Sequence, residues 1–394
     1  MPSTAVTWAD AQRQQAFDTW LRTIAPLHGL HPPSVRLASA DASFRRYLRV
    51  DATMEPASAT AVPGAHETSQ NGPAGARPAA SFVIMDAPPA QEDSAPFVQV
   101  AALMAQAGLK VPRILDWDQA HGFLLLDDLG SQTLLELIAQ QAAKPLGLAP
   151  RPAPSAAVHA HLLQSLDTLV AWQQASRPGV LPDYDEAMLR RELNLYPDEW
   201  YIARHKGLVL SDAQQAVLQN AFTLIVRDNL AAPRVYVHRD FMPRNLMVPG
   251  AADPRVGVLD FQDAVYGPVT YDIASLMRDA FLSWDEEVVI DITIRYWEKA
   301  RKAGLLDHAD WASDFGAFYR SVEWMGLQRH LKVAGIFARL TLRDGKPKYL
   351  ADTPRFTQYI RHTASRYIEL KPLMRLIDQI EGTALTEAVS FGRL

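Results

Sequence analysis

The pattern of apolar and polar residues divides the chain into two parts near residue 130. In the first part, apolar residues gather into short runs of strand length that are bounded by polar or turn-forming residues. These runs are VRLA (35–38), FRRYLRV (44–50), SFVIMDAP (81–88), VPRILDW (111–117) and GFLLLDDLG (122–130). Helical patterns cover residues 8–24 and 95–107. Five strands, with a helix between the third and the fourth, predict a small α+β lobe over residues 1–130.

Residues 131–394 carry mainly helical periodicity, and we expect a larger, mainly helical lobe there. The helical patterns cover 157–176, 185–205, 212–229 and most of 270–381, and short strand pairs are predicted near 235–248 and 256–261. Two stretches, 51–80 and 144–156, are rich in Ala and Pro, and the first has almost no large apolar side chains. We interpret both as flexible surface insertions, because such segments cannot bury enough apolar surface to become ordered.

The composition excludes several classes of protein. The 394 residues include no Cys, which excludes disulfides, cysteine zinc sites and thiol nucleophiles. The net charge of −5, without long runs of one sign, argues against a nucleic-acid partner. No N-terminal segment has the pattern of a signal peptide, and no apolar run approaches the roughly 18 residues of a membrane span. We therefore expect a cytoplasmic protein with no membrane partner.

One polar loop lies between two apolar runs, in VYVHRDFMPRNLMV (235–248). Burying charge costs several kcal/mol per ion unless a partner is present, so the loop indicates a ligand or a metal. Its spacing is His238-x-Asp240-x-x-x-x-Asn245, and Asp260 follows at the end of the apolar run in VGVLDFQDA. Phosphoryl transfer needs this set of groups. Asp240 would accept the proton of the acceptor hydroxyl, while Asn245 and Asp260 would supply oxygen ligands for Mg²⁺.

Longer stretches carry a resemblance to known enzymes: DASFRRYLRV, VIMDAPP, GFLLLDDLG, YVHRDFMPRNLMV, GVLDFQDAVYGPVTYDIASLMRD and QRHLKVAGIFARLTLRDGKPKYLADTPR. The chain resembles the protein-kinase-like superfamily of aminoglycoside phosphotransferases and choline kinases. Within it, the chain is most similar to the bacterial anomeric N-acetylmuramate/N-acetylglucosamine kinases of peptidoglycan recycling. The resemblance covers most of residues 35–360, apart from the two Ala/Pro-rich insertions.

This resemblance implies a two-lobe protein-kinase-like fold, with a five-stranded antiparallel sheet in the small lobe. It also implies an ATP- and Mg²⁺-dependent kinase that phosphorylates the anomeric hydroxyl of N-acetylmuramate, N-acetylglucosamine or both. The partner would be a small amino sugar, and we expect a monomer. His238 and Asp272 would brace the catalytic loop.

For the nucleotide, the superfamily pattern assigns SADASF (39–44) to the loop over the phosphates, with Ser43 and Phe44 in contact with ATP. This loop has no Gly, in contrast to the glycine-rich loop of protein kinases. The run GFLLLDDLG matches the hinge between the lobes. There, the carbonyl of Leu126 and the N–H of Asp128 would bind the adenine edge.

One expected residue is missing. Kinases usually place a Lys on the third strand, where it binds the phosphates and pairs with a Glu of the following helix, yet no Lys occurs in 81–109. FRRYLRV offers arginines instead. Alternation along a strand places Arg46 on the same face as Leu48 and Val50, and we expect that apolar face to turn towards the nucleotide. Arg46 is thus the predicted substitute for the Lys.

For the sugar, the helical lobe offers acidic, amide and aromatic side chains. The candidates are Glu192, Trp200, Trp284, Glu323, Trp324, Gln328, Arg329 and His330, of which we select Glu192, Trp324, Gln328 and Arg329. Arg329 or Arg339 could bind the lactyl carboxylate of N-acetylmuramate. Because the resembled family also accepts N-acetylglucosamine, which has no such group, that contact would not be essential.

Two other functions remain open from the sequence. One is another small-molecule kinase of the superfamily, acting on an aminoglycoside, choline or homoserine. A cationic acceptor would favour an acidic or aromatic pocket, and the basic stretches QRHLK and RDGKPK argue against it. The other is a non-catalytic nucleotide-binding pseudokinase. The presence of Asp240, Asn245 and Asp260 together argues against that function.

The interpretation of residues 51–80 as an insertion can be tested by deleting most of them. Loop-closure entropy depends only weakly on loop length, so we expect little change in melting temperature or in activity. Thermal unfolding and steady-state kinetics of the deletion variant, compared with the intact chain, measure both. A large loss of either would mean that the segment packs against the sheet or contributes to a site.

Overall fold

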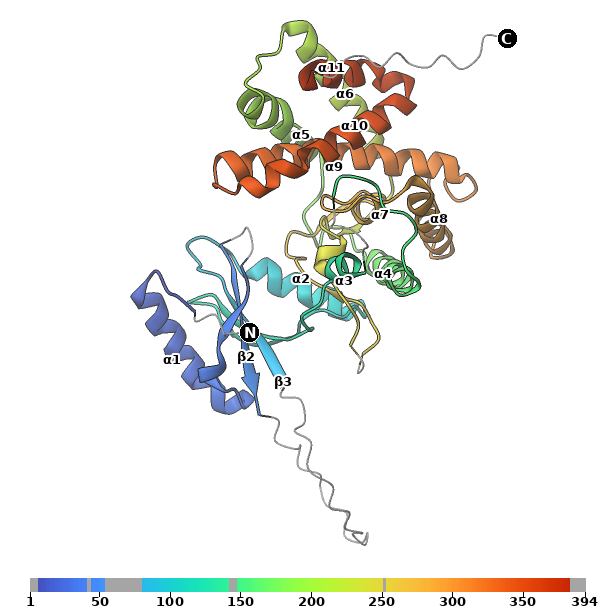
Figure 1. The fold of residues 1–394 in the computed structure, drawn as a ribbon. Helices are drawn as coiled ribbons and strands as arrows, with labels where there is room; N and C mark the ends of the chain where they lie inside the picture. The colour runs from blue at the N-terminus through green and yellow to red at the C-terminus, as the bar shows by residue number, and fades with distance from the viewer. Residues whose placement is uncertain (1–5, 41–43, 54–79, 142–146, 251–252, 383–394) are drawn as a thin grey trace, which may run out of the picture. The chain divides into compact units, whose positions relative to one another are not determined.

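The computed structural model describes residues 6–40, 44–53, 80–141, 147–250 and 253–382 (Figure 1). The chain forms two compact units. Unit 1 consists of Met1–Leu103 and Val111–Gly130, and unit 2 consists of Met104–Lys110 and Ser131–Leu394. The insertion predicted at 51–80 falls mainly on residues outside the described ranges, although β2 and β3 include its first and last residues.

Unit 1 is built on a five-stranded sheet in the order β1-β2-β3-β5-β4. Its strands are β1 (Arg36–Ala40), β2 (Arg46–Ala52), β3 (Ala80–Asp86), β4 (Ile114–Asp118) and β5 (Phe123–Asp127). All neighbouring strands are antiparallel. β5 inserts between β3 and β4, and helix α2 (Ala95–Gln106) occupies the connection from β3 to β4. The predicted five-stranded antiparallel sheet is confirmed.

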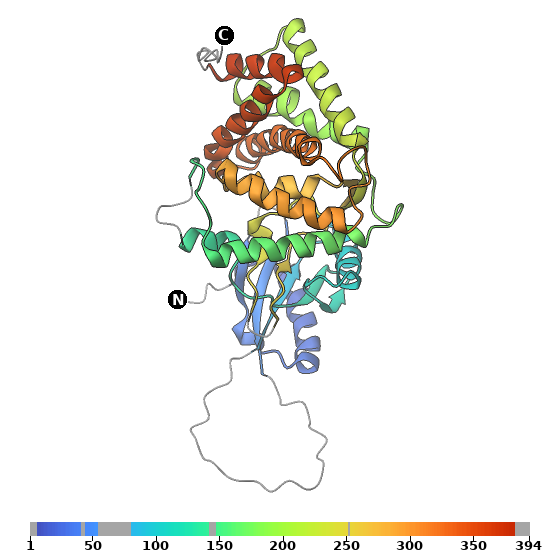
Figure 2. The same ribbon diagram turned by 90° about the vertical axis from the view of Figure 1, so that its right-hand side faces the viewer.

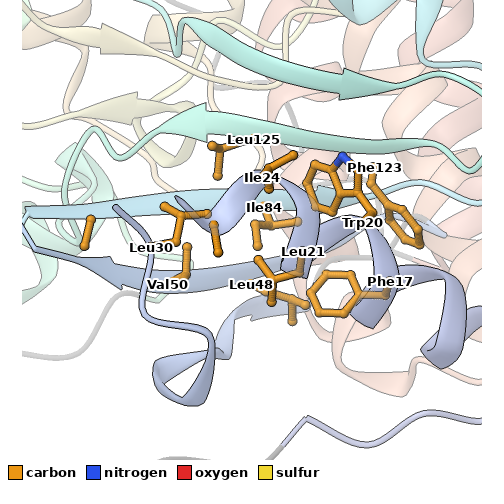
Figure 3. Packing of buried hydrophobic residues seen from close by; sticks show 12 residues of the cluster. Phe17, Trp20, Leu21, Ile24, Leu30, Leu48, Val50, Ile84, Phe123 and Leu125 are labelled. Carbon is orange, nitrogen blue, oxygen red and sulfur yellow. The ribbon is translucent and has the colours of Figure 1, made fainter. Parts of the chain in front are cut away.

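Helix α1 (Ala11–His28) covers one face of this sheet. Asp10 caps its first turn by accepting the N–H of Gln12 at 2.8 Å, and Gly29 ends it with a φ of 61°. Its apolar side chains pack against alternate strand residues, because successive strand residues point to opposite faces (Figure 3). The cluster includes Phe17, Trp20, Leu21 and Ile24 from α1 and Leu48, Val50, Ile84, Phe123 and Leu125 from the sheet.

Arg46 lies on this same face, and its environment corrects the predicted orientation. Nε of Arg46 donates to Oδ2 of Asp86 at 2.9 Å, and Nε of Arg13 donates to Oδ1 of the same carboxylate at 2.8 Å. The Arg46 guanidinium also lies 4.2 Å from the centre of the Trp8 ring. The expectation that this face turns towards a nucleotide is wrong, because α1 covers it. The guanidinium of Arg46 thus binds other residues of the protein, which does not favour a phosphate-binding role for it.

Unit 2 is mainly helical, as predicted. Its helices are α3 (Leu134–Gln140), α4 (Ala156–Gln174), α5 (Glu186–Leu193), α6 (Asp212–Ala231), α7 (Tyr271–Met277), α8 (Glu286–Lys302), α9 (Phe315–Leu342), α10 (Thr353–Arg366) and α11 (Lys371–Glu381). Two short antiparallel pairs join β6 (Arg234–Val237) to β9 (Val265–Pro268) and β7 (Leu246–Met247) to β8 (Gly257–Val258). Short 3-10 or π turns of unit 2 span Leu195–Glu199, Tyr201–His205, Pro243–Asn245, Pro347–Asp352 and Ile368–Leu370, and a 3-10 turn of unit 1 spans Pro32–Ser34.

Helix α9 is the central element of unit 2 and lies among α6, α7 and α10 (Figure 1 and Figure 2). Most of its residues between Ser321 and Ala338 are buried, so the helix is enclosed on nearly all sides. At Gly335 it passes so close to the Leu195 carbonyl that a Cβ would stand 2.5 Å from the oxygen. Within the described residues, no helix is long and apolar enough to cross a membrane.

The double ion pair at Asp86 predicts a clear stability effect. Asp86 is 1% exposed, so its removal leaves Arg13 and Arg46 without their shared partner. We expect Asp86→Ala to lower the free energy of unfolding by roughly 3 kcal/mol, near the lower end for a broken buried pair because both arginines keep some contact with water.

Guanidinium unfolding followed by tryptophan fluorescence measures this loss, with Arg113→Ala as the matched control. Arg113 pairs with Asp127 but is 75% exposed, so its removal should change stability by less than about 0.5 kcal/mol. Equal stabilities of the two variants would mean that the Asp86 pairs contribute nothing to the fold.

Candidate active site

Two polar segments that the sequence singles out meet at one end of a strand pair. β7 pairs with β8 so that Leu246 stands opposite Val258. Asn245 precedes β7 and Asp260 follows β8, which brings the two side chains to the same end of the pair. The N–H of Leu259 donates to the carbonyl of Asn245 at 2.9 Å and closes this end. The strand pairing thus explains why polar residues flank two apolar runs.

The side-chain amide of Asn245 has a fixed orientation. Its Nδ2 donates to the main-chain oxygen of Asp240 at 2.9 Å and to Oδ2 of Asp260 at 3.3 Å. Nε2 of Gln262 holds the other oxygen of Asp260 at 2.9 Å. With its two N–H groups so placed, Asn245 keeps Oδ1 for a further ligand. An amide oxygen beside a carboxylate is a donor set that fits a hard divalent cation.

Two residues of the site adopt a backbone conformation that L-residues rarely take. The φ angle is 76° at Arg239 and 63° at Asp260. Such left-handed residues cost of order 1 kcal/mol or more, and they persist only where surrounding contacts hold them. The carboxylate of Asp272, at the start of α7, supplies such contacts by accepting the N–H of His238 at 2.7 Å and that of Arg239 at 3.0 Å. Asp272 is fully buried, so water does not compete for these bonds.

His238 connects the two polar segments. Its Nε2 donates to the carbonyl of Leu259 at 3.0 Å, and its Nδ1 accepts the N–H of Asp240 at 3.2 Å. These bonds require the neutral ring with its proton on Nε2. Burial lowers the pKa of His238 below its ordinary value, which keeps the ring in that form near neutral pH. His238 therefore fixes Asp240 relative to the segment that carries Asp260.

Asp240 combines exposure with a cationic environment. Its side chain is 41% exposed, while Arg329, whose Nη2 lies 3.9 Å from Oδ1 of Asp240, is 2% exposed. Burial of the site raises the pKa of Asp240, but Lys332, Arg329 and Arg239 together lower it more, so the pKa ends below its ordinary value. The carboxylate is therefore ionised at neutral pH and open to a ligand.

A buried charge cluster supports the loop from the side of α5 and α9. Oε1 of Glu192 pairs with Arg239 and lies 3.1 Å from Nζ of Lys332, while Oε2 accepts the hydroxyl of Tyr184. Nζ of Lys332 also donates to the hydroxyl of Tyr271 at 3.1 Å. Burial raises the pKa of Glu192, but Lys332 and Arg239 lower it by more. The pKa therefore ends below its ordinary value and the carboxylate stays charged. Glu192 thus holds the side chain of Arg239, next to Asp240.

The residues predicted to bind the sugar lie in different environments. Arg329 lies beside Asp240. Gln328 is fully buried and donates through Nε2 to the carbonyl of Leu189 at 3.0 Å, and Trp324 is 1% exposed with the Arg320 guanidinium 4.1 Å from its ring centre. The structure therefore brings Arg329 to Asp240 and places Gln328 and Trp324 in helix packing. Their contacts with a sugar, and those of Glu192, stay predictions.

The other sugar candidates also have partners within unit 2. Glu323 accepts from Arg366 and from the hydroxyl of Tyr367, and the His330 ring stacks on Tyr359 with centres 4.5 Å apart. Trp284 is buried, and the Arg204 guanidinium lies over Trp200. Their positions are thus explained by packing alone.

The predicted nucleotide residues belong to unit 1. Leu126 is buried within β5, opposite Val83 of β3, and the carboxylate of Asp128 accepts from Nε of Arg49 at 2.6 Å. Phe44 is 64% exposed at the start of the segment that leads into β2. Ser43 lies outside the described residues. The predicted roles of all four in binding ATP stay predictions.

Comparison with known proteins decides the family. The profile of the phosphotransferase enzyme family (APH) matches residues 34–311. The chain is 45% identical over 376 residues to the N-acetylmuramate/N-acetylglucosamine kinase of Pseudomonas aeruginosa, covering 94% of this chain and 97% of the relative. It is 43% identical over 371 residues to the kinase of the same name from Neisseria meningitidis, covering 94% and 97%. The chain belongs to the phosphotransferase enzyme family.

Solved structures confirm the kinase-like fold for this phosphotransferase. Plasmodium vivax ethanolamine kinase superposes with a TM-score of 0.54 at 11% identity, covering 94% of this chain and 92% of its own. Choline kinase LicA from Streptococcus pneumoniae gives 0.52 at 10% identity, covering 89% and 99%. ADP-bound aminoglycoside phosphotransferase APH(2'')-Ib gives 0.51 at 12% identity, covering 89% and 97%. At these identities the likeness shows the fold alone.

The phosphotransferase site also includes residues that the sequence did not single out. Lys332 and Tyr271 flank the cluster around Glu192, and Arg239 connects that cluster to the loop. Lys332 lies three residues after Arg329 on α9, a spacing that places both side chains on neighbouring parts of one helix face. This spacing is the sequence feature that could have indicated Lys332 as a neighbour of Arg329.

Asp272 predicts a pH dependence. Burial raises its pKa to about 6, despite the N–H groups of His238 and Arg239 that favour the charged form. Below that pH the carboxyl gains a proton and loses acceptor strength, so the loop loosens. We expect kcat/KM to fall as the pH drops through about 6. Because the pKa of Asp240 is lowered, Asp240 does not cause this fall.

A pH profile of phosphotransfer for Asp272→Asn should show lower activity at every pH and no decrease centred near 6. Asp279→Asn is the matched control, because burial also raises the pKa of Asp279 to about 6 while its carboxylate accepts N–H groups of 281 and 282 instead of the loop. Persistence of the decrease in Asp272→Asn, with its loss in Asp279→Asn, would contradict the assignment.

Proposed function

We propose that this protein is an ATP-dependent kinase that phosphorylates the anomeric hydroxyl of N-acetylmuramate, N-acetylglucosamine or both, within peptidoglycan recycling. The observation that carries the proposal is the 43–45% identity to kinases named for these two sugars, over 94% of the chain. The ionised, exposed carboxylate of Asp240 beside the Asn245 and Asp260 pair supplies the groups that such a reaction needs. The cytoplasm, where ATP is available, is the proposed location, and a monomer is the proposed state.

Asp240 is the proposed catalytic residue. The anomeric oxygen attacks the γ-phosphorus of ATP, the bond from that phosphorus to the β–γ bridging oxygen breaks, and ADP leaves. The hydroxyl proton passes to the Asp240 carboxylate, which first aligns the hydroxyl by accepting its hydrogen bond. The 238–245 loop keeps this carboxylate in place through the bonds of His238 and Asp272. Positioning and charge complementarity then supply most of the rate enhancement.

Asn245 and Asp260 are the proposed ligands of a divalent cation, Mg²⁺ in our proposal. When bound, such a cation neutralises charge on the phosphate oxygens. Asp240 carries out the proton transfer separately, because its side chain is 41% exposed and its main-chain oxygen, not its carboxylate, accepts from Asn245. For the nucleotide we propose main-chain binding of adenine by the carbonyl of Leu126 and the N–H of Asp128.

Arg329 is the proposed contact for the lactyl carboxylate of N-acetylmuramate. Its guanidinium is 2% exposed and lies near the partly exposed carboxylate of Asp240. An acidic sugar bound next to Asp240 would suffer repulsion unless a cation lay close by. N-acetylglucosamine lacks this group and would depend less on Arg329.

The proposal predicts the outcome of an acceptor screen that measures ADP release in the presence of ATP and Mg²⁺. We expect turnover with N-acetylmuramate and N-acetylglucosamine and none with choline, homoserine or aminoglycosides. Asp240→Asn should lower kcat by orders of magnitude and leave ATP affinity nearly unchanged, because the nucleotide is held by other groups. Wild-type turnover in the folded variant would refute Asp240 as the base, and turnover with another acceptor class alone would refute the sugar assignment.

A further inference from the structure

The nucleotide-binding unit of this chain has no lysine for the phosphates. In protein kinases the Lys of β3 pairs with the phosphates and with a Glu of the following helix. The sequence has no Lys before Lys110, and that residue belongs to unit 2. The proposed function requires ATP, and the cations that unit 1 offers in place of the lysine are its arginines.

Most arginines in the described part of unit 1 are in the wrong place for this role. Arg13 and Arg46 bind Asp86 on the face that α1 covers, and Arg36 pairs with Asp51 at the end of β2 far from residue 44. The others of this group are Arg22, which donates to a carbonyl of its own helix, and Arg113, which is 75% exposed beside Asp127.

Arg45 differs from all of these. It precedes Arg46 by one residue, so strand alternation directs it to the face opposite α1. Its side chain is 9% exposed, and Nη2 lies 3.1 Å from Oε2 of Glu92. Glu92 stands in the connection between β3 and α2, and its side chain is 18% exposed. The pairing of a cation with a carboxylate that follows β3 is thus present here, with the cation directly before β2.

The position of Arg45 along the sheet also fits a nucleotide. Arg49 lies on the same face and bonds to Asp128, next to the segment proposed to bind adenine. Arg45 lies four residues back along the strand direction, about 13 Å at the rise of an extended chain. A nucleotide that binds adenine near Asp128 and extends along this face would bring its phosphates towards Arg45.

We propose that Arg45, oriented by Glu92, binds the phosphates of ATP in place of the missing lysine. A guanidinium presents a planar fork of N–H donors that matches two phosphate oxygens and stays charged at any working pH. The 3.1 Å contact between Nη2 and Oε2 of Glu92 orients this fork. Arg45 is thereby a nucleotide-binding residue, and Glu92 is a positioning residue.

Calorimetric titration of the full chain with adenosine, ADP and ATP, with Mg²⁺ and without sugar, tests this proposal. Arg45→Ala should weaken ADP and ATP by about 10- to 100-fold, the loss expected for charge-assisted hydrogen bonds. Adenosine should bind within about 2-fold of wild type, since it has no phosphate. Arg45→Lys should restore part of the loss. Arg46→Ala is the matched control and should leave all three affinities within about 2-fold, because Arg13 still holds Asp86.

Glu92→Gln gives a second variant that keeps Arg45 and should weaken ATP by a smaller factor while leaving adenosine unchanged. An equal loss for adenosine and ATP in Arg45→Ala would assign Arg45 a structural role only and overturn the proposal. Unchanged ATP affinity in that variant, or a loss in Arg46→Ala instead, would overturn it as well. A wild-type chain that binds ATP through Arg45 but phosphorylates no amino sugar would refute the proposed acceptor and still support this inference.

Discussion

The buried carboxylate of Asp272 is the constraint on which the site depends. It accepts the N–H groups of His238 and Arg239, and so holds Arg239 in a left-handed conformation that the residue would not adopt alone. That turn directs Asp240 outwards while His238 points inwards to Leu259. Because Asp272 begins α7, the geometry of the loop is tied to a helix and to the core behind it. The hydrogen bonds to Asp272 thereby hold the polar loop in one conformation.

Charge balance around this loop explains how so many ionisable groups share one region. Arg239 and Lys332 meet Glu192, and Arg329 lies near Asp240. Burying a lone charge is costly, whereas paired and hydrogen-bonded charges are tolerated. The accessible member of the group is Asp240, and its neighbours favour its ionised form. The cluster under the loop therefore serves the reactivity of one exposed carboxylate.

Unit 1 also relies on pairs between carboxylates and arginines. In unit 1, Asp86 joins two arginines under α1, and Glu92 holds a third, Arg45, on the other face. Arg45 and Arg46 are adjacent at the start of β2, so a structural ion pair and a proposed phosphate-binding group stand on neighbouring residues. The chain keeps the kinase-like fold although residues 81–109 include no lysine.

The sequence by itself determined the features that depend on residues close together in the chain. The alternating runs predicted the five strands, and the spacing of Asp240, Asn245 and Asp260 indicated phosphoryl transfer, since one loop and one strand pair place all three. Alternation along the strand also placed Arg46 on the same face as Leu48 and Val50. Which face α1 covers was decided by the tertiary structure, because that contact joins residues far apart in the chain. The same holds for Glu192 and Lys332, whose meeting with Arg239 depends on the packing of α5 and α9 against the loop.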